Sequence, residues 1–343
     1  MRFFRSMTVF ALLVADGLAA HAQEATATKP KIRVGIIGVD TSHAAVFTAL
    51  VKDPKNDPKL PGLDIEAALK SIDIVAAYPV SSPDISNSTE RIAGFTDKIK
   101  QLGVEIVPSI DALLERVDAV LIESVDGRPH LEQVRPVLAS HKPVFIDKPV
   151  AGSLADAIEI YRLAEQAGTP CFSSSSLRFG PSLVAMRNNP KLGGVLGCDV
   201  YSPCSLEPHH PDLFWYGIHG VEMVYALMGR GCISVQRTHT DDTDVVTGVW
   251  KDGRVAQYRG LRAGRSGYGG LVYGAKGIEP IGSFAGYAPL LVEIAEFFKT
   301  GKPPVPAAET IEMFAFMEAA DESKRQGGCP VTIESVMQRA TSK

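Results

Sequence analysis

The sequence predicts an α/β protein with two domains: a doubly wound parallel sheet at residues 31–150, and a second α/β domain with a mostly antiparallel sheet at residues 151–343. Up to about residue 150, short apolar runs alternate with helical segments, as in βαβ units. After Cys171, glycines, prolines and alternating strands become frequent, which is typical of an antiparallel sheet packed on helices. A chain of 343 residues is long enough to bury two cores.

The first domain is predicted from apolar strands and from helices with recognisable ends. Strands are expected at residues 34–38, 72–78, 105–107, 119–123 and 144–146. Helical segments are expected at residues 44–50, 66–71, 89–102, 110–116, 129–140 and 154–166, with Gly103 and Gly168 ending two of them. Residues 53–62 are rich in proline, lysine and aspartate, and predict a loop. Because strands and helices alternate, the sheet should be parallel.

The second domain is predicted to combine strands with three helices. Strands are expected at residues 197–201, 233–240, 245–251, 255–259 and 270–273, and helices at residues 215–228, 287–299 and 309–326. No internal repeat is visible in the sequence.

The first predicted strand leads through Gly38 into a polar turn and a helix, which is the opening of a βαβ unit. Thr41 and Ser42 are good helix caps, and the bare N–H groups of a helix start favour an anion such as a phosphate. The dinucleotide fingerprint is G-x-G-x-x-G, but only its first glycine is present, and His43 ends the pattern. Asp40 is expected to place a carboxylate where a pyrophosphate would lie. The turn therefore predicts either a nucleotide site or a plain α/β turn.

Composition excludes some classes of partner. Hydrophobic residues make up 45% and charged residues 22% of the chain, as in soluble globular proteins. The net charge is −4 without a basic run, so a nucleic acid is not expected as a partner. Outside the first residues no stretch is long enough to span a membrane.

The first 22 residues are expected to be an export signal, followed by a linker at residues 23–30. Arg2 and Arg5 form a basic end, residues 7–15 are apolar, and Ala20-His21-Ala22 matches a cleavage site before Gln23. The mature protein should then be periplasmic or extracellular. General secretion threads unfolded chains, so a nicotinamide cofactor would have to be bound after export.

Five cysteines are present, at positions 171, 198, 204, 232 and 329. They show no C-x-x-C spacing, and an odd number leaves at least one of them unpaired in an oxidising compartment. We expect buried thiols.

Five local patterns occur in order along the chain: VGIIG at 34–38; PH at 129–130 with VFIDKP at 144–149; LRFGP at 177–181; GIHGVE at 217–222 with LMG at 227–229; and EFFKTGKPP at 296–304 with AADESKRQGG at 319–328. In this order and spacing the chain resembles the glucose–fructose oxidoreductase / inositol dehydrogenase family, Gfo/Idh/MocA, over roughly the whole mature chain. The resemblance implies a Rossmann domain, a C-terminal α/β domain with a large open sheet, and NAD- or NADP-dependent oxidation or reduction of a sugar or cyclitol. It also implies a homo-oligomer and a small-molecule carbohydrate substrate.

The resemblance also implies roles for individual residues. The family's Glu-Lys-Pro triplet corresponds to Asp147-Lys148-Pro149, with Lys148 near the reacting hydroxyl and close to the cofactor. His219 takes the place of the general base, and Glu222 follows it on the same helix face. Asp147 is expected at the substrate.

Three further residues are candidates for substrate contact: His130, Arg178 and Trp215. His130 could equally cap or pack its helix. Trp215 stands where the family has a catalytic aspartate, four residues before His219. The departures are two missing glycines in the fingerprint, the missing acid after the second strand, where Tyr78 stands, and this tryptophan. Together they indicate a member with altered cofactor use.

Three functions remain open at this stage. The first is a nicotinamide-dependent sugar oxidoreductase. The second is a cofactor-independent lyase, epimerase or hydrolase that uses Lys148, His219 and Glu222, with or without a metal. The third is a sugar-binding protein with residues 214–216 as a stacking platform. No metal site is predicted, although His209, His210 and Asp212 offer ligand types for zinc or manganese; a solvated loop is the preferred interpretation of that stretch.

Overall fold

The structure, a computed structural model, describes residues 30–56 and 63–342. The expected signal peptide at residues 1–22, and all of the expected linker except Pro30, lie outside the described residues. Among the described residues, no helix combines the length and the apolar character that crossing a membrane requires.

A six-stranded parallel sheet organises the first part of the chain, with the strand order β3-β2-β1-β4-β5-β6. Its strands are β1 (Ile32–Ile37), β2 (Ile72–Tyr78), β3 (Glu105–Ile106), β4 (Ala119–Ile122), β5 (Val144–Asp147) and β6 (Cys171–Ser174). This is the doubly wound order in which ligands bind at the carboxyl ends of the strands, near the point where the order reverses between β1 and β4. β6 is the sixth strand and comes from the region that we assigned to the second domain.

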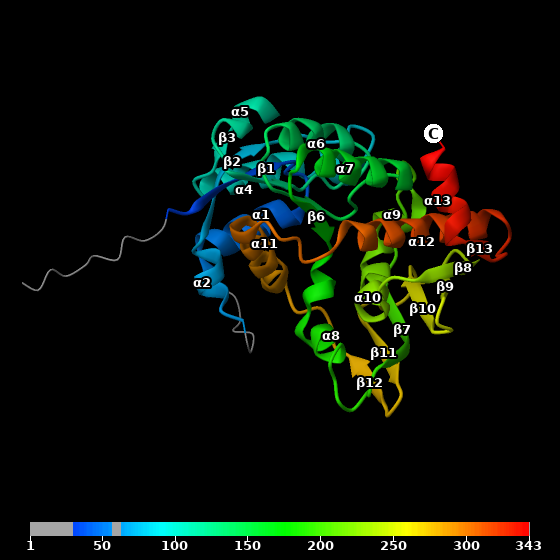
Figure 1. Cartoon of the computed structure of the whole chain (residues 1–343). Helices are drawn as coiled ribbons and strands as arrows, with labels where there is room; N and C mark the ends of the chain where they lie inside the picture. The colour runs from blue at the N-terminus through cyan, green and yellow to red at the C-terminus, as the bar shows by residue number, and fades with distance from the viewer. Residues whose placement is uncertain (1–29, 57–62, 343) are drawn as a thin grey trace, which may run out of the picture. The chain divides into compact units, whose positions relative to one another are not determined.

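Helices cover both faces of this sheet (Figure 1). α5 (Ile110–Leu114), α6 (His130–Ala139) and α7 (Leu154–Ala167) pack on one face, and α1 (Ser42–Lys52), α2 (Ile65–Leu69) and α4 (Ile92–Gln101) on the other. The short helices η1 (Pro54–Asn56) and α3 (Ser86–Thr89) lie in the connections. In β1, Val34 and Ile36 face one core and Ile37 faces the other, as the two-residue period of a strand requires.

A seven-stranded sheet organises the second part, with the order β12-β11-β7-β10-β9-β8-β13. Its strands are β7 (Val195–Pro203), β8 (Cys232–His239), β9 (Thr243–Trp250), β10 (Val255–Leu261), β11 (Gly269–Gly274), β12 (Ile278–Ile281) and β13 (Val331–Thr332). All neighbours are antiparallel except β7 and β10, which are parallel. The predicted fold class is therefore confirmed.

The remaining helices connect the two sheets or cover the second one, except α11, which packs on the first. They are η2 (Ser176–Phe179), α8 (Pro181–Met186), α9 (Asp212–Trp215), α10 (Ile218–Met228), α11 (Ala288–Thr300), α12 (Ala307–Arg325) and α13 (Ile333–Thr341). Every residue of α10 is buried, so it forms the central packing element of this part. α11 returns to the first sheet and packs beside α2 (Figure 1), which brings Tyr287 next to α1.

Several elements differ from the sequence prediction. The helix expected at 215–228 is two helices, α9 and α10, because the backbone leaves the helical conformation at Tyr216, whose φ is −128°. β6, β12, β13 and α13 were not predicted. Four of the five expected buried thiols are buried, but Cys329 is exposed.

Candidate functional site

A cavity of about 140 Å³ lies where the carboxyl ends of the parallel strands meet the second sheet's helices. It is lined by Thr41, Ser42, His43, Arg91, Val125, Lys148, Ser176, Leu177, Tyr216, His219, Tyr268, Phe284 and Tyr287. Pockets for drug-sized ligands measure about 300–1,000 Å³, so this cavity holds a small molecule or one end of a larger one. Lys148 and His219, which come from the two parts of the chain, both line this cavity.

Lys148 and His43 are held on either side of Asp147, the last residue of β5. His43 Nδ1 lies 2.7 Å from Asp147 Oδ2, and Lys148 Nζ lies 3.9 Å from the same oxygen. Burial alone would raise the pKa of Asp147, but the charges of His43 and Lys148 and the hydrogen bond from His43 lower it to about 2. Asp147 is therefore a carboxylate that orients its neighbours, and it does not line the cavity itself.

His219 enters the cavity from the start of α10. Its Nδ1 pairs with Ser175 Oγ at 2.8 Å, and its ring packs edge-on against Tyr216 and Tyr268. Burial, followed by the positive charges of Lys148 and His43, holds the pKa of His219 well below its usual value. The imidazole is therefore neutral at neutral pH, and its Nε2 makes no hydrogen bond to any described residue.

Glu222 and Arg178 do not lie at this cavity, contrary to the roles expected for them. Arg178 donates from Nε to Glu222, and its Nη1 pairs with Glu309 at 2.6 Å. Glu222 also accepts a 2.8 Å hydrogen bond from Ser174 Oγ, and it has no accessible surface. A buried ion pair of this kind loses its compensation if either partner leaves, so these two residues join β6, η2 and α10 structurally.

The other two expected substrate contacts are also packed away from the cavity. His130 is fully buried, and its Nε2 lies 3.0 Å from the carbonyl oxygen of Ser124. Trp215 is 7% exposed and packs on His210, with ring centroids 5.2 Å apart. Phe214 packs on Phe314 in the core, so of the expected stacking platform only Tyr216 lines the cavity.

The first turn fits a bound anion only in part. Gly38 has a φ of +83°, and a Cβ there would lie 2.2 Å from Ser124 Oγ, so the turn requires glycine. Thr41 caps α1 by accepting a 3.4 Å hydrogen bond from the Ala44 N–H, and together with Ser42 and His43 it faces the cavity. The start of α1 therefore fits an anion such as a cofactor phosphate.

We expected Asp40 to point outward at this helix start, but the structure shows that it does not. It is 1% exposed and accepts hydrogen bonds from Ser88 Oγ at 2.5 Å and from the Val125 N–H at 3.0 Å. Through these bonds it joins the β1 loop to the loops after β2 and β4, across the point where the strand order reverses. At the end of β2, Tyr78 stands in place of a ribose-binding carboxylate, so the adenosine end lacks its usual partner.

The alternative metal ligands are not brought together. His209 pairs with Glu207 at the surface, whereas the ring of His210 lies under Trp215. Asp212 pairs with Arg237 and Lys324. The solvated-loop interpretation holds for His209. His210 instead packs on Trp215, and Asp212 forms ion pairs.

Sequence reasoning missed several residues of the cavity. Tyr268, Phe284 and Tyr287 form its aromatic wall together with Tyr216, and Arg91 lies at its edge. They lie in loops between strands and helices, where no periodic sequence pattern indicates which residues line a cavity. Glu123, directly after β4, was also missed; a charged residue that ends a buried strand is the signal that could have found it.

Residues 32–175 match the model of the GFO_IDH_MocA oxidoreductase family, described as having an NAD-binding Rossmann fold. A probable dehydrogenase from Thermotoga maritima superposes with a TM-score of 0.70 at 20% identity, over 89% of this chain and 100% of that one.

The scyllo-inositol dehydrogenase from Lactobacillus casei, solved with NAD(H) and scyllo-inositol, has a TM-score of 0.70 at 16% identity, over 89% of this chain and 100% of that one. At these identities the likeness establishes the fold. No curated protein sequence matches the chain.

Proposed function

We propose that the chain oxidises or reduces a hydroxyl-bearing carbon of a sugar or cyclitol with NAD or NADP. The match of residues 32–175 to the model of the NAD-binding Gfo/Idh/MocA oxidoreductase family supports this proposal. One observation carries the proposal: Lys148 and His219, from the two parts of the chain, line one small cavity at the start of α1. A base and a cation beside a helix N-terminus suit alcohol oxidation.

The nicotinamide would supply the hydride chemistry, and this chain would hold it through Thr41 and Ser42 at the start of α1. The protein's own contribution is to place the substrate and to move its hydroxyl proton. The absent ribose acid, where Tyr78 stands, indicates weak binding of the adenosine end.

The proton chemistry is assigned to two residues. Neutral His219 would accept the hydroxyl proton at Nε2, because Ser175 occupies its other nitrogen. The Lys148 ammonium would lower the cost of the alkoxide that forms as the proton leaves. Asp147 keeps His43 and Lys148 in place through its ionised carboxylate.

The substrate class is inferred from the walls of the cavity. Four aromatic rings supply flat apolar faces that suit the C–H face of a sugar or cyclitol, and the polar side chains opposite suit its hydroxyls. The similarity in fold to a scyllo-inositol dehydrogenase supports the same class.

We further propose that the chain is exported and forms homo-oligomers. Val255, Leu271 and Ile278 lie exposed on one face of the second sheet, each at least 42% exposed. A second copy of the chain would cover such a face. Light scattering of wild-type protein and of Leu271→Glu would test this, and a monomeric wild-type protein would exclude it.

The experiment that tests the function is a fluorescence titration of purified protein with NAD(H) and NADP(H), followed by absorbance assays at 340 nm with a panel of sugars and cyclitols. We expect saturable binding, and turnover that requires added nicotinamide. Substitution of the surface residue His209 by Ala is the control and should leave both unchanged. Turnover without nicotinamide would overturn the proposal in favour of a cofactor-independent enzyme.

A further inference from the structure

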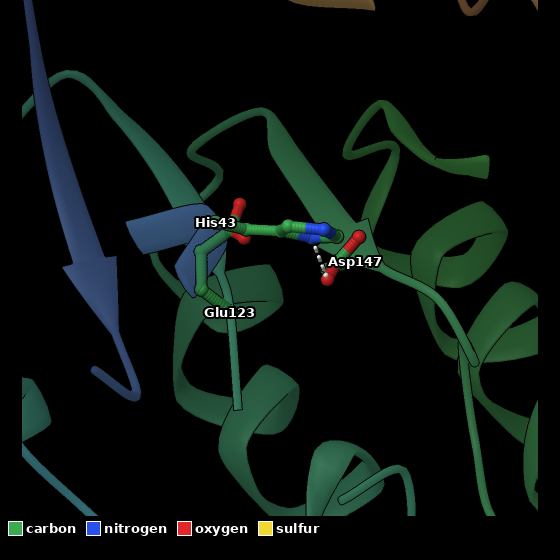
Figure 2. Close-up of side chains that lie close together, drawn as sticks. All are labelled: His43, Glu123 and Asp147. Atoms are coloured by element: carbon green, nitrogen blue, oxygen red, sulfur yellow. Dashed lines mark hydrogen bonds and ion pairs between the residues drawn. The ribbon is translucent and has the colours of Figure 1, made fainter. Parts of the chain in front are cut away.

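Three side chains from different elements converge beside the cavity. His43 lies in the first turn of α1, Glu123 directly after β4 and Asp147 at the end of β5. One ligand atom of each lies within 4.8 Å of the other two (Figure 2). Figure 2 shows the His43 ring turned toward the Asp147 carboxylate.

Glu123 is the unusual member of this cluster. It has no accessible surface, and neither of its carboxylate oxygens has a hydrogen-bond partner among the described residues. Asp147 Oδ1 is also buried without a partner there. A buried carboxylate without hydrogen bonds or a counter-ion is strongly unfavourable, so this arrangement calls for a cation or a proton at Glu123.

Among the described residues no side chain forms a hydrogen bond or ion pair with Glu123, although the charge of Lys148 acts on it. Lys148 Nζ lies 3.9 Å from Asp147 Oδ2, and no ion pair joins it to Glu123. A proton alone is a poor solution, because a protonated Glu123 would still bury a donor and an acceptor without partners.

We propose that His43, Glu123 and Asp147 bind a divalent transition-metal cation of the Mn²⁺ or Zn²⁺ type. An imidazole and two carboxylates are ligands that these ions share, whereas Mg²⁺ and Ca²⁺ sites use oxygen ligands alone. Two carboxylates also match the ion's double charge. The inference does not depend on the proposed oxidoreductase, because binding needs neither nicotinamide nor substrate.

The three ligand atoms would have to move to hold the ion, since they now lie within 4.8 Å of one another. Ligand atoms around a tetrahedral ion with bonds of about 2.1 Å lie about 3.4 Å apart. His43 Nδ1 and Asp147 Oδ2 are now 2.7 Å apart, so the ion would replace the proton between them and move them apart slightly. His43 also lines the cavity, so the remaining coordination positions would face a substrate oxygen or water there.

The test uses mature protein freed of metal with EDTA and titrated with Mn²⁺, with the free ion followed by electron paramagnetic resonance. We expect one Mn²⁺ per chain at micromolar affinity. Glu123→Gln and Asp147→Asn should each weaken binding by at least tenfold. Glu207→Gln, which alters the exposed pair with His209, is the matched control and should bind as wild type does.

Thermal unfolding shows whether a variant that binds no metal is still folded. Without metal, Glu123→Gln should still fold. Its unfolding temperature should equal or exceed that of wild type, because the substitution removes a buried unpaired charge. Zn²⁺ or Mn²⁺ should raise the unfolding temperature of wild type and leave that of Glu123→Gln unchanged. Wild type that binds no Mn²⁺, or Glu123→Gln that binds it as tightly as wild type, would overturn the proposal.

Discussion

The proton acceptor His219 gives the sharpest prediction. Its imidazole is neutral in the folded protein because burial and the charges of Lys148 and His43 lower its pKa. A base is active when unprotonated, so turnover should rise with pH through the pKa of His219 and then level off. Because that pKa is lowered, the rise should lie below the pH at which an ordinary histidine titrates.

The perturbation is Lys148→Met, which keeps the apolar stem and removes the charge. Without this neighbouring cation the pKa of His219 should increase, so the acid limb of the pH profile should move to higher pH. Turnover should also fall about 10²-fold or more, which is about 2.7 kcal/mol of transition-state stabilisation. His219→Ala should lose a similar factor and the acid limb with it. Ser175→Ala should cost less, about tenfold, since it frees Nδ1 but keeps the base.

The assay combines initial rates over a range of pH with histidine side-chain nuclear magnetic resonance, which follows the titration of His219 without a substrate. A His219 that titrates at or above the ordinary histidine value would refute the reasoning. The same pKa of His219 in Lys148→Met as in wild type would refute it as well, since Lys148 and His219 would then not interact.

Three further outcomes are expected. Asp40→Asn should strengthen NAD(H) binding by about fivefold in a fluorescence titration, since it removes a negative charge beside the start of α1; an unchanged Kd would mean that the phosphates lie elsewhere. Arg178→Met should lower the free energy of unfolding by about 3–5 kcal/mol in urea, because it leaves the buried carboxylate of Glu222 unpaired, whereas Arg325→Met at an exposed pair should cost less than about 1 kcal/mol. Protein exported by a suitable host should begin near Gln23 by intact mass, and retained Met1 on cytoplasmic protein would contradict export.

Strands with a strong apolar signal were predictable from sequence, and weak ones were not. β2 was predicted at its observed bounds because seven mostly apolar residues form it. β6 was missed because two of its four residues are serines. It forms nonetheless because Phe172 packs between Phe145 and Phe297, a tertiary contact that no local pattern records.

The roles of polar residues were harder to predict than their positions. Lys148 and His219 both line the cavity, because Lys148 follows the end of a strand and His219 lies at the start of a helix that faces it. Glu222 shares a helix with His219, and that proximity suggested shared chemistry. In the structure, Glu222 points toward Arg178 and pairs with it. The spacing of residues in the sequence could not show that a buried arginine lies next to Glu222.

The metal inference bears on the choice between the open functions. A site of His43, Glu123 and Asp147 lies at the carboxyl ends of β4 and β5, beside the two residues assigned to proton transfer. A cation there would polarise a substrate oxygen, which serves hydride transfer and also proton abstraction next to a carbonyl group. Measuring turnover with and without added metal, and with and without added nicotinamide, therefore separates the cases. Turnover that requires both indicates a metal-assisted dehydrogenase. Metal dependence alone indicates that the Rossmann fold has been retained for acid–base chemistry without a hydride carrier.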